Sequence, residues 1–431
     1  MRPRNQRPAP GTIPGRGPAP LARRLRCAAL LLGVGAVCLA SAPAGETPAD
    51  PDLSTQGTRR AGPFHIRPYV ALKDVGYDDN IRLEAAQPEG DFTATAGPGL
   101  SALLLTGDRG GVFISQEYDY VSFRDNTDLN HWNTSARARG ILLLKRLDLS
   151  LEDRYASVRE RPNTEIDQRL HRGENALTAA LRTLGKGRLG VAAYARRERI
   201  DYSADSAFSE SVSRQLDRDE SSLSLTAQVR VLPKTSFLLE AVLERAEFDD
   251  RSQGRDTRAR SLLPGFRFDP SASLQGQFQI GVMSLEAPDR PQADYRGTVG
   301  AGSLSTRMGG SARLKGTFVR DLVYSTVGDN LHYISTAWSL AYQQFFSRRL
   351  SGEILYGPGR NRYPLEVIRA GTTPFQGIRE DRIRLYQASV YYRVNDQLRF
   401  NLGAARQKRD SSDDFFDRER NFYALGSTYD F

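Results

Sequence analysis

The sequence predicts an all-β fold, a transmembrane antiparallel up-and-down β-barrel of about 18 strands (16–18). Three observations predict it. Apolar and polar residues alternate along segments of roughly ten residues, short turns alternate with long polar stretches, and the chain ends on an aromatic residue, Phe431. Such barrels alternate lipid-facing and lumen-facing residues, so the negative mean hydropathy of this chain is compatible with membrane insertion.

Residues 1–44 have the features of a secretory signal peptide. A basic segment with seven arginines precedes an apolar stretch, residues 27–40, and small residues follow at 41–44. Cleavage is expected after Ala42 or Ala44, and a short membrane anchor is the alternative. Residues 45–62, rich in Pro, Gly, Thr and Asp, are expected to be a disordered periplasmic linker, and residues 63–431 to form the barrel.

Charge and cysteine content exclude several classes of protein. Seven of the 60 basic residues and none of the 51 acidic residues lie in 1–44, which leaves 53 basic and 51 acidic residues. The basic pI therefore reflects the leader, and we expect no nucleic-acid partner. Both cysteines, Cys27 and Cys38, also lie in the leader, so we expect no disulfide, thiolate nucleophile or zinc-thiolate site in the rest of the chain.

The alternation of faces is clearest where a leucine-rich face opposes a hydroxyl-rich one. Leu223, Leu225 and Ala227 alternate with Ser224 and Thr226, as expected for a strand with one lipid-facing side. The same pattern recurs at 237–244, 274–282 and 398–404, and is weakest at 295–306, which is rich in Gly and Ser. A soluble sandwich or propeller is the alternative fold, but sandwich strands are shorter and no motif recurs in register here.

Turn residues divide the barrel segment at regular intervals. Eight tight turns are predicted near 107–110, 145–147, 185–187, 233–234, 269–271, 308–310, 347–349 and 395–396. Longer polar stretches between them are predicted as loops at 124–133, 159–171, 203–219, 248–256, 286–294, 361–378 and 410–417. Eight short turns joining nine hairpins give 18 strands with both termini in the periplasm, which closes the barrel without an edge.

The last strand carries an assembly signal. Tyr423, Leu425, Tyr429 and Phe431 lie at even spacing on one face. The terminal aromatic with Tyr429 two residues earlier resembles the recognition signal of the barrel-assembly machinery. We therefore expect outer-membrane localisation, with membrane lipids, lipopolysaccharide and the assembly machinery as partners.

Charged residues on the polar faces are the candidate solute contacts. Five cations are predicted to face the lumen, and one inward tyrosine is a candidate sugar contact: Arg230, Arg313, Lys315, Arg393, Arg399 and Tyr391. A barrel of 16 to 18 strands is wide enough for an aqueous channel. The alternative is a lumen closed by its own salt bridges or by an inward-folded loop, and the long 361–378 stretch is the candidate for such a loop.

Catalytic and metal-binding patterns are weak. The four histidines form no metal-binding spacing, and no serine adjoins a histidine in a recognisable motif. Acidic pairs such as Asp249-Asp250 could bind calcium but are more often solvated loop charges. We expect no enzymatic activity, no cofactor and no metal.

The opening strand carries a family resemblance. Residues 67–70 followed by Tyr77, Asp78, Asp79 and Asn80 resemble the start of a β-barrel porin family that includes outer-membrane proteins associated with exopolysaccharide biosynthesis operons. The resemblance implies a barrel acting in polysaccharide export, and export proteins as partners. The leading expectation is therefore a channel for exopolysaccharide or other polar solutes. The alternatives are a non-conducting docking barrel of a polysaccharide secretion system and, last, an outer-membrane enzyme.

Overall fold

The computed structural model describes residues 59–183, 188–204, 206–269, 272–369 and 374–431. The expected signal peptide and most of the expected linker lie outside these residues. The strands are β1 (Arg59–Ala61), β2 (Phe64–Asp78), β3 (Asp91–Leu105), β4 (Gly110–Phe123), β5 (His131–Leu143), β6 (Leu147–Glu160), β7 (Leu170–Thr183), β8 (Leu189–Tyr202), β9 (Arg218–Leu232), β10 (Thr235–Phe248), β11 (Thr257–Phe268), β12 (Leu274–Glu286), β13 (Tyr295–Met308), β14 (Ala312–Tyr324), β15 (His332–Phe345), β16 (Leu350–Arg369), β17 (Phe375–Arg393), β18 (Leu398–Ser411) and β19 (Arg418–Asp430).

The helical segments lie in the connections. They are the α-helix α2 (Ala207–Leu216) and five single 3-10 turns, η2 (Gly107–Arg109), η3 (Thr127–Leu129), η4 (Arg251–Gln253), η5 (Pro291–Ala293) and η6 (Asp414–Phe416). No helix in the described ranges is long and apolar enough to cross a membrane.

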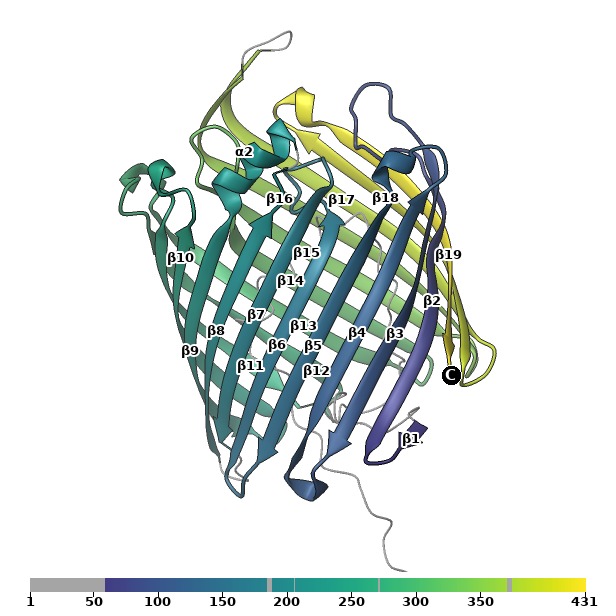
Figure 1. The fold of residues 1–431 in the computed structure, drawn as a ribbon. Helices are drawn as coiled ribbons and strands as arrows, with labels where there is room; N and C mark the ends of the chain where they lie inside the picture. Colours follow the sequence, from purple (N-terminus) through teal and green to yellow (C-terminus); the bar gives the residue numbers. More distant parts are fainter. Residues whose placement is uncertain (1–58, 184–187, 205, 270–271, 370–373) are drawn as a thin grey trace, which may run out of the picture.

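Strands β2 to β19 form a closed antiparallel barrel of 18 strands, which confirms the predicted fold class. Each strand pairs with the next along the chain, and β19 pairs with β2 to close the ring. The short β1 pairs only with the start of β2. The last residues of the expected linker therefore form a small hairpin with the first strand of the barrel. Short turns lie at one end of the barrel, and the longer loops with α2 lie at the other (Figure 1).

Six of the eight predicted turns lie between successive strands. The turn predicted at 185–187 and most of the one at 269–271 lie outside the described residues. Gly309 lies in the turn between β13 and β14 with a φ of 62°, a conformation that glycine adopts without steric cost. The segment predicted as the weakest strand is the regular strand β13. One predicted loop is wrong: most of 361–378 continues β16 and β17, whose hairpin therefore extends beyond its neighbours (Figure 1).

The two faces of the wall differ as the sequence predicts. Large apolar side chains such as Leu223 and Leu225 are exposed on the outside, whereas the intervening Ser224 and Thr226 are buried inside. Apolar residues also cover part of the inner wall over β10 to β14, in a cluster that includes Val242, Leu263 and Met283. The interior is therefore lined by polar and apolar areas rather than filled by one central core.

Candidate functional site

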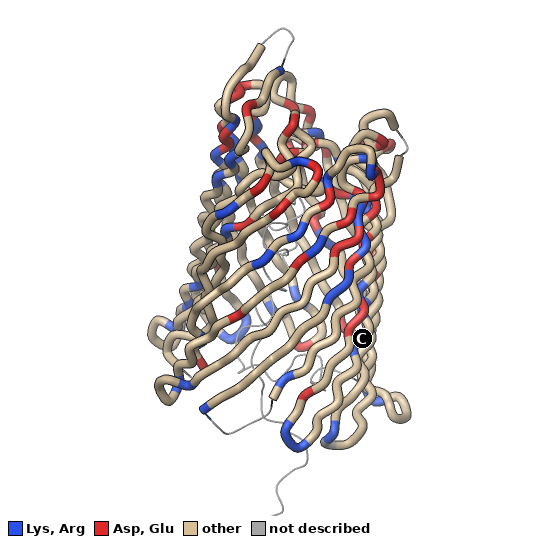
Figure 2. The backbone as a smooth tube through the Cα atoms, turned by 90° about the vertical axis from the view of Figure 1, so that its left-hand side faces the viewer, with Lys and Arg blue, Asp and Glu red and all other residues tan. Residues whose placement is uncertain are grey.

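The six predicted solute-contact residues all lie at the short-turn end of the barrel. Arg230 is two residues before the end of β9, Arg313 and Lys315 begin β14, Tyr391 and Arg393 end β17, and Arg399 begins β18. Each lies on the inner side, as the register with inward-facing neighbours shows. They surround the mouth at this end instead of following the whole lumen. Figure 2 shows basic residues at the turns, and basic and acidic residues interspersed toward the loop end.

Not all of these cations are equally available to a solute. Arg230, Lys315 and Arg393 are exposed. Arg399 instead donates a hydrogen bond of 2.6 Å from Nη2 to Asp430 Oδ2, and Arg67 Nε donates to the other oxygen of this carboxylate at 2.9 Å. Arg399 therefore belongs to an ion-pair group that ties β18, β19 and β2 together.

The connection between β6 and β7, residues 161–169, contacts distant parts of the barrel, and we call it the inward loop. Its residues Asn163, Glu165 and Ile166 are buried. Glu165 contacts Ser325 and Thr326, which follow β14, and other residues of the loop contact β16, β18 and β19. Because β6 and β7 are separated from β14–β19 around the barrel, the inward loop must cross the interior to reach them. The sequence analysis predicted that residues 361–378 could fold into the lumen, and it did not identify residues 161–169.

Polar contacts anchor the tip of the inward loop to the opposite wall. Glu165 accepts hydrogen bonds from Ser325 Oγ at 2.8 Å, from Thr326 N at 2.7 Å and from Thr326 Oγ1 at 2.6 Å. Thr164 Oγ1 accepts one from Asn361 Nδ2 at 2.6 Å. The three bonds to the Glu165 carboxylate have a charged acceptor, and hydrogen bonds of this kind are among the stronger ones in proteins.

An ion-pair group holds the second half of the inward loop. Asp167 accepts from Arg409 Nη2 at 2.9 Å to both carboxylate oxygens and from Arg418 Nε at 3.0 Å. On the near side, Arg161 Nη2 donates to Ile81 O at 2.6 Å. Burial among other guanidinium groups lowers the pKa of Arg169, in the same loop, to about 10.

Other loops cover the inward loop from outside. Ile166 and Leu170 pack with Val212 and Leu216 of α2 in one buried apolar cluster. In the adjoining loops, Arg255 Nη2 donates to Ser325 O at 2.6 Å. The loop end of the barrel is therefore closed by packed segments, whereas the turn end presents exposed charges.

A cavity of about 180 Å³ lies beneath the inward loop. Pro162 and Asn163 form part of its lining, and Met283 and Leu285 give it one apolar side. Its charged side carries an Arg-x-Glu pair on each of three neighbouring strands: Arg172 and Glu174 on β7, Arg196 and Glu198 on β8, and Arg218 and Glu220 on β9. The guanidinium and the carboxylate of each pair form an ion pair, so groups of both signs line this side of the cavity.

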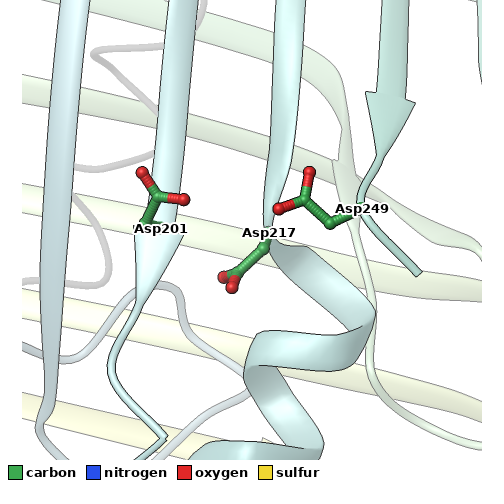
Figure 3. A group of neighbouring side chains, drawn as sticks. All are labelled: Asp201, Asp217 and Asp249. Atoms are coloured by element: carbon green, nitrogen blue, oxygen red, sulfur yellow. The ribbon is translucent and has the colours of Figure 1, made fainter.

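One group of carboxylates has the geometry to hold a cation. Ligand oxygens of Asp201, Asp217 and Asp249 lie within 4.8 Å of one another, and they come from the end of β8, the end of α2 and the residue after β10 (Figure 3). Arg199 already donates to Asp201 at 2.7 Å and to Asp249 at 2.7 Å. This hydrogen bonding lowers the pKa of Asp249, while burial raises the pKa of Asp217. Asp217 accepts instead from Tyr202 N at 2.7 Å and from Ser213 Oγ at 2.5 Å, so each of the three carboxylates already has a partner within the chain.

One contact bears on the enzyme alternative. Ser157 Oγ lies 3.1 Å from His171 Nε2 on adjacent strands, a pair that the sequence spacing did not reveal. The structure also places His131 and His171 at the starts of β5 and β7, not in loops as their polar surroundings suggested. Among the described residues, no side chain is hydrogen-bonded to the other ring nitrogen of His171. The pair therefore lacks the orienting third group of a hydrolase triad.

Tyr429 and Phe431 lie at the seam of the barrel. Their rings are in edge contact at 5.0 Å, and both side chains are exposed on the outside. Phe431 N donates to Pro68 O at 3.0 Å. This placement is compatible with an assembly signal that is read from the membrane side.

Comparisons with solved structures show similar barrels at low identity. The outer membrane protein OpdK from Pseudomonas aeruginosa is 14% identical, with a TM-score of 0.46 over 85% of this chain and 98% of that one. The siderophore receptor PirA from Pseudomonas aeruginosa is 9% identical, with a TM-score of 0.44 over 85% and 80%. The FrpB iron transporter from Neisseria meningitidis is 8% identical, with a TM-score of 0.46 over 80% and 61%.

Comparison with curated protein sequences gives no significant match. A family model, by contrast, matches residues 50–431, which is most of the chain and the whole of the barrel. The protein is thus a porin-like outer-membrane β-barrel, and it belongs to the family described as "Putative beta-barrel porin 2".

Proposed function

We propose that the barrel is a channel for exopolysaccharide or other polar solutes, and that the inward loop is its constriction. The observation that carries the proposal is the anchoring of this loop. Its tip is held across the interior by hydrogen bonds and ion pairs of Glu165 and Asp167, and such contacts can be exchanged for contacts with water or with a solute. Ile166 of the same loop packs in an apolar cluster with α2, and movement of the whole loop would expose that cluster to water. We therefore expect the polar tip to move and Ile166 to stay packed.

The charge distribution supports passage of a polar solute. Exposed cations at the turn end, among them Arg230, Lys315 and Arg393, can donate hydrogen bonds to hydroxyls or carboxylates entering from the periplasm. The Arg-x-Glu pairs then provide both donors and acceptors above the mouth. The polysaccharide part of the proposal rests on the resemblance of the opening strand to barrels of exopolysaccharide operons.

A reversible cross-link tests the constriction. Residues 59–431 contain no cysteine, so Thr164→Cys with Asn361→Cys introduces one possible disulfide in the barrel, where the two native side chains are 2.6 Å apart. We expect single-channel conductance in planar bilayers to fall on oxidation and to return with a reductant. Each single cysteine variant is the control and should not respond. Equal conductance in the oxidised and reduced double variant would overturn the proposed role of the loop.

The second candidate function is a non-conducting docking barrel. The packing of α2 and the neighbouring loops over the inward loop favours it, because this closes the loop end. Absence of conductance from inserted protein, even with the inward loop shortened, would support this candidate over the channel.

A further inference from the structure

Five buried polar side chains form a patch on the inner wall below the cavity. They are Thr226 of β9, Glu240 of β10, Ser261 of β11, and Gln277 and Gln279 of β12, and we call them the hydroxyl–amide belt. None is more than 8% exposed. Each has a polar atom without a hydrogen-bond partner among the described residues: Oγ1, Oε1, Oγ, Nε2 and Oε1, respectively.

Unpaired buried polar atoms are unfavourable, and folded proteins keep few of them. Five on four adjacent strands therefore indicate a site that is completed from outside the chain. Their other atoms are fixed: Gln279 Nε2 donates to Glu240 Oε2 at 3.1 Å, and Gln277 Oε1 accepts from Arg267 Nε at 3.0 Å. The unpaired donor and acceptors are thus held in place in advance of any partner.

The belt continues the walls of the cavity toward the turn end. Glu244, Ala259 and Met283 line the cavity. Glu240 lies four residues further along the same face of β10, and Ser261 is the next inward residue of β11. A solute that passes between the mouth and the cavity must therefore pass the belt.

An aromatic ring adjoins the belt on the next strand. Tyr194 of β8 pairs with Ser224 of β9 in the register, and it is 8% exposed on the inner side. Arg182 Nε donates to Tyr194 Oη at 2.7 Å, which fixes the ring in place. Such a ring offers an apolar face beside a group of hydrogen-bonding atoms.

The chemistry of the belt fits an uncharged solute with many hydroxyls. Amide and hydroxyl groups both donate and accept, as a sugar hydroxyl does, and Glu240 is the only ionisable group among the five. Most of the unpaired atoms of the belt belong to neutral hydroxyl and amide groups, which suit a neutral solute better than an ion that would have to give up its hydration here. We propose that the belt binds a neutral saccharide during its passage. The inference rests on the proposed channel function and narrows its substrate class.

The test is block of single-channel current by a neutral oligosaccharide. The protein purified from outer membranes would be measured with maltohexaose and, separately, with an acidic uronate hexamer. The variant is Gln277→Leu with Gln279→Leu, which removes amides and keeps volume. The control is Gln387→Leu, an inner-face residue of β17 whose amide donates to Ser389.

We expect maltohexaose to block the wild type and the control alike, and to block the double variant with about ten-fold lower affinity, a loss typical of removing hydrogen-bonding groups from a site. Equal block of the wild type and the double variant would overturn the inference, as would stronger block by the acidic hexamer that the double variant abolishes. The double variant also removes the hydrogen bonds that the two amides make with Arg267 and Glu240, so we expect it to unfold at a lower temperature than the wild type. A cooperative thermal transition shows that it is folded.

Failure of the inference can be separated from failure of the proposed function. If no variant conducts, the channel proposal is wrong, and equilibrium binding of fluorescent maltohexaose to detergent-solubilised protein then tests the belt alone. If the protein conducts but maltohexaose neither blocks nor binds, the belt takes up water only and the inference is wrong.

Discussion

At the scale of single residues, arginine side chains form most of the ion pairs inside the described part of this barrel. Arg409 and Arg418 both contact Asp167 of the inward loop. Arg199 of β8 contacts Asp249, which follows β10. A planar guanidinium with five donors can satisfy several acceptors at once, which lysine cannot do in the same geometry. The scarcity of lysine on the inner wall follows from this requirement.

The carboxylate of Asp167 provides a residue-scale prediction. Asp167→Asn removes the charge between Arg409 and Arg418 and should destabilise the anchored position of the inward loop by about 3 kcal/mol, because two buried guanidinium groups lose their counter-ion. We expect longer open times and a larger single-channel conductance.

The control for this change is Asp128→Asn. Asp128 pairs with Arg82 at 3.3 Å in exposed loops, and its side chain is 66% accessible, so the loss should be below about 1 kcal/mol. Equal effects of the two substitutions on conductance would contradict the anchoring role of Asp167.

Sequence patterns predicted the side to which each residue points but not its partner. The period of two places Arg230, Lys315 and Arg393 on the inner face, because successive strand residues face opposite sides. Whether Arg399 is free for a solute depends on Asp430, which pairs with it across the seam. The roles of all six candidate residues as solute contacts stay predictions.

At the scale of elements, the positions of the short turns could be predicted from the sequence, whereas the conformations and contacts of the long loops could not. A short turn needs particular residues at particular positions, as at Gly309, so it leaves a local signal. The continuation of β16 and β17 through the predicted 361–378 loop depends on pairing between the two strands over most of its length. The inward loop had one weak signal, the apolar Ile166 within a polar stretch.

The terminal strand gives a prediction at this scale. Deletion of Phe431 should lower the amount of assembled barrel in the outer membrane, while the refolded protein should keep nearly its full thermal stability, because the ring lies on the exposed outer side. Heat-modifiable migration on gels measures assembly. Phe346→Ala, at an exposed turn residue, is the control; if it impairs assembly equally, Phe431 is no specific signal.

At the scale of the whole molecule, the two ends of the barrel differ in charge and in closure. The turn end presents exposed cations, and the loop end carries basic and acidic residues side by side (Figure 2). A field of one sign at a channel mouth raises the local concentration of ions of the opposite sign. The net charge of the chain, in which the two signs nearly cancel outside residues 1–44, does not indicate this arrangement.

Reversal of the exposed mouth charges tests the field. The triple variant Arg230→Glu, Lys315→Glu and Arg393→Glu should raise the cation-over-anion permeability ratio by roughly two-fold or more. Reversal potentials in a salt gradient give this ratio. Arg382→Glu, an exposed position on the outer face of β17, should leave it unchanged. An unaltered ratio in the triple variant would mean that ions do not pass this mouth.

The pairing of β19 with β2 has a consequence for circular permutation of the chain. Gly76 lies so close to β19 that a Cβ there would be 1.7 Å from Tyr423 O, and backbone pairing runs along this seam from Phe422 to Asp430. The seam is therefore a paired part of the wall like the junctions between consecutive strands. A circular permutant that joins Phe431 to the start of β2 and opens the ring at an exposed turn should form the same wall, although its new last strand would no longer carry the native terminal aromatic.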